Sequence, residues 1–269
     1  MGNIAAERPI GVYDSGVGGL TVLRQMQQRL PAEQMVYFGD TARHPYGNRS
    51  VQEIVGFSRQ ALAFFLSLDA KLMVAACNTV SALALPVLAA EAPIPVIGVI
   101  KAGAKVAMAV TENKRIGIIG TNATVQSQAY TRALQMLDQK VQVWEEACPR
   151  LASLVEAGCW DGEPVETCLA KHLMPLVGHR IDTLVLGCTH YPLVLPSIRQ
   201  LLDPGVNIVD PAEAVAKDIY EELRRSNLLA EGKAQRYKLY VSGEPRDFQV
   251  MAGRFGYTNS VCQIDVERL

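Results

Sequence analysis

The chain has 269 residues, of which 49% are hydrophobic and 20% are charged, and its formal net charge at pH 7 is −1. This composition is typical of a globular protein, and the balanced, scattered charge argues against nucleic acid or a membrane surface as a partner. Because no apolar run reaches the roughly 18 residues of a membrane span, we expect a cytoplasmic protein with one large or two ordinary domains.

Short apolar runs recur along the whole chain, and helix-like segments separate most of them. Such an alternation predicts parallel sheets with helices on both faces, and therefore an α/β fold. The expected strands are Ile10–Tyr13, Met35–Phe38, Leu72–Ala76, Val96–Val99, Ile116–Ile119, Val141–Trp144, Thr183–Leu186, Ile208–Val209, Lys238–Val241 and Val261–Ile264.

Three helices have local start signals or a clear amphipathic pattern. The segment Ser50–Glu53 is a capping box, and it predicts a helix that ends near Leu68. The apolar periodicity of Asn122–Leu137 predicts a second helix. Asp210–Pro211 predicts the start of a third, with aspartate as the cap and proline in the first helical position.

Two parts of the chain repeat one pattern. Cys77 and Cys188 lie 111 positions apart, and each follows an apolar run and precedes a helix-like segment that soon reaches Leu–Pro. The segment Asp14–Gly16 has a counterpart at a similar offset in Gly120–Asn122. We therefore expect two pseudo-symmetric domains. The first comprises residues 1–100 plus 210–269, with the C-terminal tail folded back onto it, and the second comprises residues 101–209.

The two repeated cysteines suggest acid–base chemistry. If both lie at the ends of equivalent strands, their thiols could face each other across a cleft between the domains. A thiol has an ordinary pKa near 8.5, so modest tuning lets it accept or donate a proton near neutral pH. One thiol could remove a proton from one face of a carbon while the other returns a proton to the opposite face.

Polar residues collect where the predicted strands end, which is where α/β sheets bind ligands. Ser15, Asn78, Thr79, Thr121 and Thr189 offer short donors there, and several precede helices. Free backbone N–H groups at helix starts favour an anion, so the expected ligand is a small carboxylate. Taken one at a time, each of these hydroxyls is better explained as a helix cap with no role in ligand binding.

Other readings of the same residues remain open. Asp14 could orient Cys77, and His190 could orient Cys188, but a lone cysteine with histidine as its base would also suit an amidase or thiol hydrolase. Cys188–His190 lacks a second ligand pair at helical or knuckle spacing, so we expect no metal. Gly16–Gly19 follows a strand but lacks a phosphate-loop lysine. The six cysteines form no C-x-x-C motif and are expected to be free.

Four motifs together resemble those of the aspartate/glutamate racemase superfamily, and of glutamate racemases within it. They are Asp14–Leu20, Pro45–Gly47, Cys77–Thr79 and Gly187–Pro192, in the family's order and spacing. The histidine after Cys–Thr favours glutamate racemase over aspartate racemase. The resemblance implies two α/β domains with the active site in the cleft between them, and cofactor-independent interconversion of L- and D-glutamate that supplies peptidoglycan synthesis. It also implies a homodimer.

The resemblance assigns roles to residues that match the family's motifs. Cys77 and Cys188 would exchange the α-proton, with Asp14, His190 and Glu156 in support and Asp40 as a weaker candidate. Substrate binding would fall to Asp14, Ser15, Tyr46, Gly47, Asn78, Thr79, Thr189 and His190, and Thr121 is added from its position at a strand end. No cofactor, metal, nucleic acid or membrane is implied.

Two alternatives of different kinds remain. A superfamily member could act on aspartate or a hydantoin, or could decarboxylate a malonate. A non-enzymatic α/β module that closes on a carboxylate would need the donors but would not need two thiols.

Overall fold

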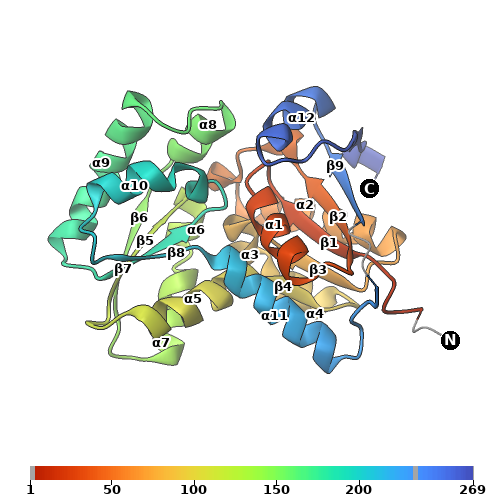
Figure 1. Cartoon of the computed structure of the whole chain (residues 1–269), viewed down its shortest axis with the longest axis horizontal. Helices are drawn as coiled ribbons and strands as arrows, with labels where there is room; N and C mark the ends of the chain where they lie inside the picture. Colours follow the sequence, from red (N-terminus) through yellow and green to blue (C-terminus); the bar gives the residue numbers. More distant parts are fainter. Residues whose placement is uncertain (1–3, 233–235, 269) are drawn as a thin grey trace.

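The protein is described by a computed structural model that covers residues 4–232 and 236–268. It consists of two lobes, each built on a parallel sheet with helices on both sides (Figure 1). The larger sheet has the strand order β10-β9-β2-β1-β3-β4, and the smaller has the order β6-β5-β7-β8. Their strands are β1 Ile10–Asp14, β2 Gln34–Gly39, β3 Leu72–Ala75, β4 Val96–Gly98, β5 Arg115–Gly120, β6 Gln142–Ala147, β7 Thr183–Gly187, β8 Asn207–Val209, β9 Arg236–Val241 and β10 Val261–Gln263.

All ten strands expected from the sequence are present, and their ends lie within three residues of the expected ones. Their apolar character has a direct structural cause, because β1, β3 and β7 are buried along their whole length. Helices cover both faces of these sheets, so the strands read as continuous apolar runs rather than alternating ones. The prediction of an α/β fold with parallel sheets is confirmed.

The internal repeat is visible in the strand order. The order β2-β1-β3-β4 of the first lobe corresponds strand for strand to β6-β5-β7-β8 of the second. The strands that precede Cys77 and Cys188, β3 and β7, occupy equivalent places in the two sheets. The C-terminal tail returns to the first lobe, where β9 pairs with β2. The division of the chain at residues 100/101 and 209/210 stays a prediction.

The helices lie between the strands in the chain. They are α1 Leu20–Arg29, α2 Val51–Ser67, α3 Asn78–Leu83, α4 Leu85–Glu91, α5 Val99–Val110, α6 Asn122–Gln126, α7 Ala129–Leu137, α8 Leu151–Glu156, α9 Glu163–Gly178, α10 Leu195–Leu201, α11 Pro211–Arg225 and α12 Pro245–Arg254. Short 3₁₀ turns occur at Thr41–Arg43, Tyr46–Asn48, Tyr191–Val194 and Val266–Arg268. None of the helices in the described ranges combines the length and apolar character needed to cross a membrane.

The two predicted helix starts that rest on a capping signal are confirmed in atomic detail, and the third predicted helix also begins at Asn122 as expected. Ser50 Oγ accepts a hydrogen bond from the Glu53 backbone N–H (3.2 Å), and the Glu53 carboxylate accepts one from the Ser50 N–H (2.9 Å). Asp210 caps α11 by accepting from the Ala212 N–H at 3.0 Å. In each case a side-chain acceptor satisfies a backbone donor that the first helical turn leaves free.

The single helix expected over residues 122–137 is wrong, because the segment is broken into α6 and α7. Gln128 between them has a left-handed backbone with φ of 51°. Ser127 causes the break, since its hydroxyl donates to the Thr124 carbonyl (2.5 Å) and accepts from the Ala129 N–H (3.1 Å). A side chain that bonds the local backbone in this way competes with the helix.

Helices α5 and α11 connect the lobes. The chain passes from β4 into the second lobe through α5 and leaves that lobe after β8 through α11. These two helices pack against each other, and α5 also packs on α7 while α11 packs on α1 (Figure 1). The lobes are thus joined on one side by a helical layer, and the carboxyl ends of β3 and β7 carry the two repeated cysteines.

Candidate active site

The two repeated cysteines face one cavity that lies between the lobes. Cys77 follows β3 and Cys188 follows β7, and both line a cavity of about 30 Å³. Each thiol otherwise belongs to the apolar core of its own lobe. Of the residues predicted for the site, those that line the cavity are Ser15, Tyr46, Gly47, Cys77, Asn78, Thr79, Thr121, Cys188, Thr189 and His190.

Cys77 is held as a thiol in this closed cavity. It precedes the first turn of α3, and its Sγ lies 3.7 Å from the Ser15 hydroxyl oxygen, to which it donates. Burial, followed by the nearby charge of Asp14, raises the pKa of Cys77 to about 12. Both effects disfavour the negative thiolate. This sulfur therefore carries a proton that it can donate.

Cys188 lies beside a histidine–carboxylate pair. Its Sγ is 3.5 Å from His190 Nδ1, and His190 Nε2 is 2.6 Å from Glu156 Oε1. Burial opposes the charged imidazole, but the bonds and charges of Cys188 and Glu156 outweigh it and raise the pKa of His190 well above its usual range. Burial also opposes the charge of Glu156, yet His190 lowers the pKa of this carboxyl to about 2. The arrangement places a cation next to the Cys188 sulfur.

Asp14 and Glu156 are predicted site residues that lie behind the cavity wall rather than in it. Asp14 accepts from the Thr189 hydroxyl (3.1 Å), and Glu156 accepts from the Val17 N–H (3.0 Å), so each carboxylate joins the two lobes. Burial raises the pKa of Asp14, while His190 acts in the opposite direction. Both carboxylates reach the cavity through residues that line it.

Threonine hydroxyls and an amide supply donors on the other side of the cavity. Thr79 Oγ1 lies 2.9 Å from Thr121 Oγ1 and 3.3 Å from Thr124 Oγ1, and Thr121 lies 3.0 Å from Thr124. This triangle joins α3 of the first lobe to the start of α6 in the second. The Tyr130 hydroxyl donates to Asn78 Oδ1 at 2.7 Å, which leaves the Asn78 amide N–H₂ as the donor for a ligand.

Comparison with known proteins identifies the family of the chain. A sequence profile of the family described as Asp/Glu/Hydantoin racemase matches residues 10–219. The chain belongs to this racemase family. It is 48% identical over 239 residues to a glutamate racemase of Gloeobacter violaceus, a match that covers 89% of each chain.

Solved racemase structures share the whole fold. The glutamate racemase isoform RacE1 of Bacillus anthracis superposes with a TM-score of 0.94 at 41% identity, covering 97% of this chain and 98% of the other. The glutamate racemase of Francisella tularensis, solved in complex with D-glutamate, superposes with a TM-score of 0.90 at 34% identity, covering 98% of this chain and 100% of the other.

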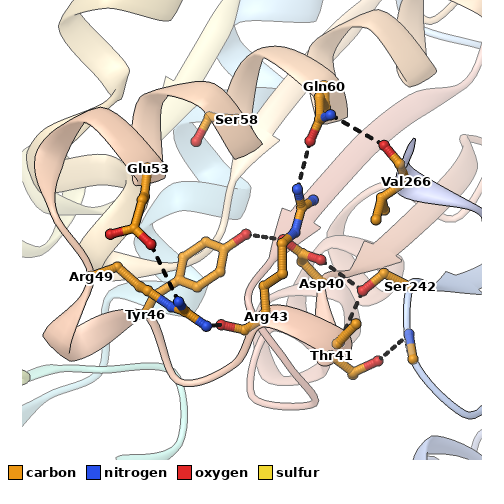
Figure 2. Close-up of polar contacts among 12 residues, drawn as sticks. Asp40, Thr41, Arg43, Tyr46, Arg49, Glu53, Ser58, Gln60, Ser242 and Val266 are labelled. Carbon is orange, nitrogen blue, oxygen red and sulfur yellow. Dashed lines mark hydrogen bonds and ion pairs between the residues drawn. The ribbon is translucent and has the colours of Figure 1, made fainter. Parts of the chain in front are cut away.

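In this member of the racemase family, an Asp40-centred network holds the loop that carries Tyr46 (Figure 2). The Tyr46 hydroxyl donates to Asp40, which also accepts from Arg43 (2.7 Å) and from the Ser242 hydroxyl (2.6 Å). Gln60 in α2 accepts from Arg43 at 2.5 Å. Asp40 therefore lies outside the cavity and fixes one wall of it against the segment that follows β9.

Sequence reasoning missed several residues that form the racemase cavity or its second layer. His44 lines the cavity, and Thr124 completes the threonine triangle. Asn122 donates to Asn48 Oδ1 at 2.9 Å and thereby connects the lobes at the rim. His44 directly precedes the Pro45–Gly47 motif, so its place in the chain was a usable signal. No local pattern in the sequence distinguishes Thr124 or Asn48.

The close approach of Gly18 to the second lobe yields a testable prediction. A Cβ at position 18 would lie 2.5 Å from Thr189 Oγ1 and 2.8 Å from His190 Nδ1. Gly18→Ala should therefore displace both groups, and a misplacement of about 1 Å can cost on the order of 10²-fold in rate. We expect kcat for racemisation to fall by about that factor. The control is Gly56→Ala in α2, where nothing lies within 4 Å; an equal loss there would contradict the prediction.

The Glu156–His190 pair predicts a loss of stability in acid. The pKa of Glu156 is about 2 in the folded chain and ordinarily 4.5. The ionised carboxylate therefore makes its full contribution to the free energy of unfolding above about pH 4.5, and this contribution is lost as the pH falls through 2. This shift corresponds to on the order of 3 kcal/mol. The raised pKa of His190 acts in a different pH range. Its contribution to the free energy of unfolding is complete below its ordinary pKa of 6.5 and is lost only as the pH rises through the raised pKa.

We therefore expect the difference in unfolding free energy between the wild type and Glu156→Gln to shrink between about pH 5 and pH 2. Urea unfolding at several pH values measures this difference. A difference that stays constant over the same range would show that the Glu156 carboxylate does not stabilise the fold in this way.

Proposed function

We propose that this racemase-family chain interconverts L-glutamate and D-glutamate without a cofactor, and that Cys77 and Cys188 exchange the α-proton on opposite faces of the substrate. The observation that carries the proposal is the meeting of two thiols, from equivalent strand ends of the two lobes, at one cavity. A pure binding module would require the donors around the cavity but would have no use for the second thiol.

In the proposed reaction the α-carbon of glutamate loses one proton and gains another on its opposite face. In one direction the Cys188 thiolate takes the α-proton, and the Cys77 thiol donates its proton to the opposite face of the same carbon. The reverse reaction exchanges the two roles. The high pKa of Cys77 supports it as the acid in the first direction, and the His190 imidazole, 3.5 Å from the Cys188 sulfur, is placed to assist Cys188 as the base.

Donors around the cavity would stabilise the carbanion-like state through the substrate carboxylate. The Asn78 amide and the Thr79 and Thr121 hydroxyls are positioned for this role, and Ser15, Tyr46, Gly47 and Thr189 line other parts of the cavity. Loss of one such donor typically costs roughly 3–4 kcal/mol. Asp14, His190 and Glu156 would hold the thiols and donors in their protonation states and orientations.

The size of the cavity requires the lobes to open for the substrate. A volume of about 30 Å³ is far below the roughly 300 Å³ or more of ordinary ligand sites. The structure therefore represents a closed state, and α5 and α11 form the connection about which the lobes would separate. Closure around the substrate would exclude water from the carbanion-like state.

Glutamate is favoured over other family substrates by the relatives. The Gloeobacter violaceus and Bacillus anthracis proteins are named glutamate racemases, and the Francisella tularensis enzyme was solved with D-glutamate. We further propose that the product D-glutamate serves peptidoglycan synthesis. Assembly as a homodimer, cytoplasmic location and the absence of nucleic-acid or membrane partners stay predictions from the sequence.

Racemisation in D₂O tests the proposal. Circular dichroism should follow the loss of optical activity from either enantiomer of glutamate, and mass spectrometry should find one deuterium at Cα of the product enantiomer. Product without deuterium would contradict solvent-exchangeable thiol donors. Turnover of aspartate, a hydantoin or a malonate in place of glutamate would assign a different substrate within the family, and glutamate binding without turnover would favour the binding module.

A further inference from the structure

Three side chains with metal-binding chemistry meet beside the cavity. One ligand atom from each of His44, Glu156 and His190 lies within 4.8 Å of the other two. His44 Nδ1 is 4.0 Å from Glu156 Oε1, which in turn is 2.6 Å from His190 Nε2. They come from three distant parts of the sequence, so the search for locally spaced ligand pairs could not have found them.

His44 has no role in the proposed racemisation, and its imidazole contacts Glu156 and His190 without a hydrogen bond to either. Both ring nitrogens are shielded from solvent, and neither meets a group with hydrogen-bond geometry within residues 4–232 and 236–268. An imidazole nitrogen that makes no hydrogen bond can offer its lone pair to a metal ion.

We propose that His44, Glu156 and His190 bind a zinc ion that reversibly switches off the racemase. Two imidazoles and one carboxylate form a set that zinc uses with a fourth position left to water or another ligand. The binding site itself follows from these three side chains alone, and its inhibitory effect rests on the proposed function.

The geometry needs only small adjustments to accept the ion. Zinc bonds of about 2.0–2.2 Å in tetrahedral geometry place ligand atoms roughly 3.3–3.5 Å apart. His44 would approach the other two ligands, and zinc would displace the proton that His190 Nε2 shares with Glu156, so that binding releases one proton to solvent. Glu156 also borders a separate hollow of about 310 Å³ that Glu244 and Asp247 line. This negatively lined hollow offers a cation a route to the site.

Inhibition would follow because the three zinc ligands belong to both lobes. His44 precedes the Tyr46 turn of the first lobe, whereas Glu156 and His190 belong to the second lobe. An ion bound to all three would join the lobes in the closed state, whose cavity of about 30 Å³ has no room for glutamate. It would also tie the imidazole beside Cys188 to the metal.

The test measures metal binding directly, on purified protein stripped of metal with a chelator. Titration calorimetry should show one zinc ion bound per chain in the wild type. His44→Gln should raise the dissociation constant for zinc at least tenfold, because loss of even a residue that only hydrogen-bonds a zinc ligand costs about 10–100-fold in affinity. The matched control is His172→Gln, which removes a histidine that also pairs with a carboxylate, 2.9 Å from Glu146, but lies outside the site. Zinc affinity that is unchanged in His44→Gln, or lost equally in His172→Gln, would overturn the proposal.

Cobalt(II) as a spectroscopic substitute excludes the thiols as ligands and does not depend on any variant that might fold poorly. Cobalt bound to the wild type should give visible ligand-field bands without the near-ultraviolet charge-transfer band of thiolate ligation, whereas that band would assign the metal to Cys77 or Cys188 and contradict the proposal. Zinc should also inhibit racemisation in the wild type far more strongly than in His44→Gln, each measured against its own metal-free rate. If the chain binds zinc as expected but does not racemise glutamate, only the proposed function fails.

Discussion

Either Cys77→Ser or Cys188→Ser is expected to reduce the rate of glutamate racemisation by about 10²–10⁴-fold, the range that a positioned acid or base contributes. A serine hydroxyl is far less acidic than a thiol, so the variant cannot supply or remove the α-proton from its side of the substrate. Because the two sulfurs line one cavity from opposite lobes, neither can take over the role of the other. The rate is measured by circular dichroism in both directions.

The two variants should differ in a second measurement, the exchange of the α-hydrogen with D₂O. Each variant retains one thiol, which can still remove a proton from the face it meets and return a deuteron to that same face. We therefore expect each variant to exchange the α-hydrogen of one enantiomer without inverting it, and the favoured enantiomer to differ between the two. Exchange of the same enantiomer in both variants would contradict thiols on opposite faces.

The matched control for this experiment is Cys168→Ser. It makes the same chemical change at a half-buried free cysteine that does not line the cavity. Racemisation should remain near the wild-type rate. Near-normal racemisation in both Cys77→Ser and Cys188→Ser would remove the basis of the two-thiol scheme, whatever the control shows.

The sequence predicted the parts of the site that depend on local pattern. Every strand was found because strands buried on both faces are continuous apolar runs, as in β3 and β7. Since parallel strands end at the same edge of a sheet, their following residues could be placed together, and Thr121 was found in this way. The repeat around Cys77 and Cys188 then predicted that the strand ends of the two sheets face a single cleft.

The parts that escaped prediction depend on contacts between distant segments. Thr124 takes part in the site because α6 meets α3 of the other lobe. The break after α6 arises from one serine hydroxyl that bonds the backbone on both sides, which apolar periodicity does not register. Asp40 follows a strand, as the cavity-lining residues at the other strand ends do, yet its side chain bonds Tyr46 and Ser242 instead of facing the cavity. Side-chain direction at a strand end is set by tertiary packing.

The ion pair between Lys71 and Glu33 is buried in the first lobe, so the loss of one partner should be strongly destabilising. Both side chains are only 2% exposed, and Lys71 Nζ lies 2.5 Å from Glu33 Oε2. Lys71 also donates to the carbonyl oxygens of Ala6 and Leu228, and Glu33 accepts from the Ala230 N–H at 2.9 Å. The pair therefore ties the N-terminal segment and the chain after α11 to the starts of β2 and β3.

Lys71→Met is expected to lower the free energy of unfolding by about 3–5 kcal/mol, because it leaves the Glu33 carboxylate buried without a counter-charge. Adding Glu33→Gln should restore part of that loss, since the amide oxygen can still accept from the Ala230 N–H while the uncompensated charge is gone. The control is Lys105→Met, which breaks the exposed pair with Asp218 and should cost no more than about 1 kcal/mol. Urea unfolding followed by circular dichroism measures all three. If the double substitution were less stable than Lys71→Met alone, the buried charge would not be the cause of the loss, and the severed hydrogen bonds to Ala6 and Leu228 would have to account for it.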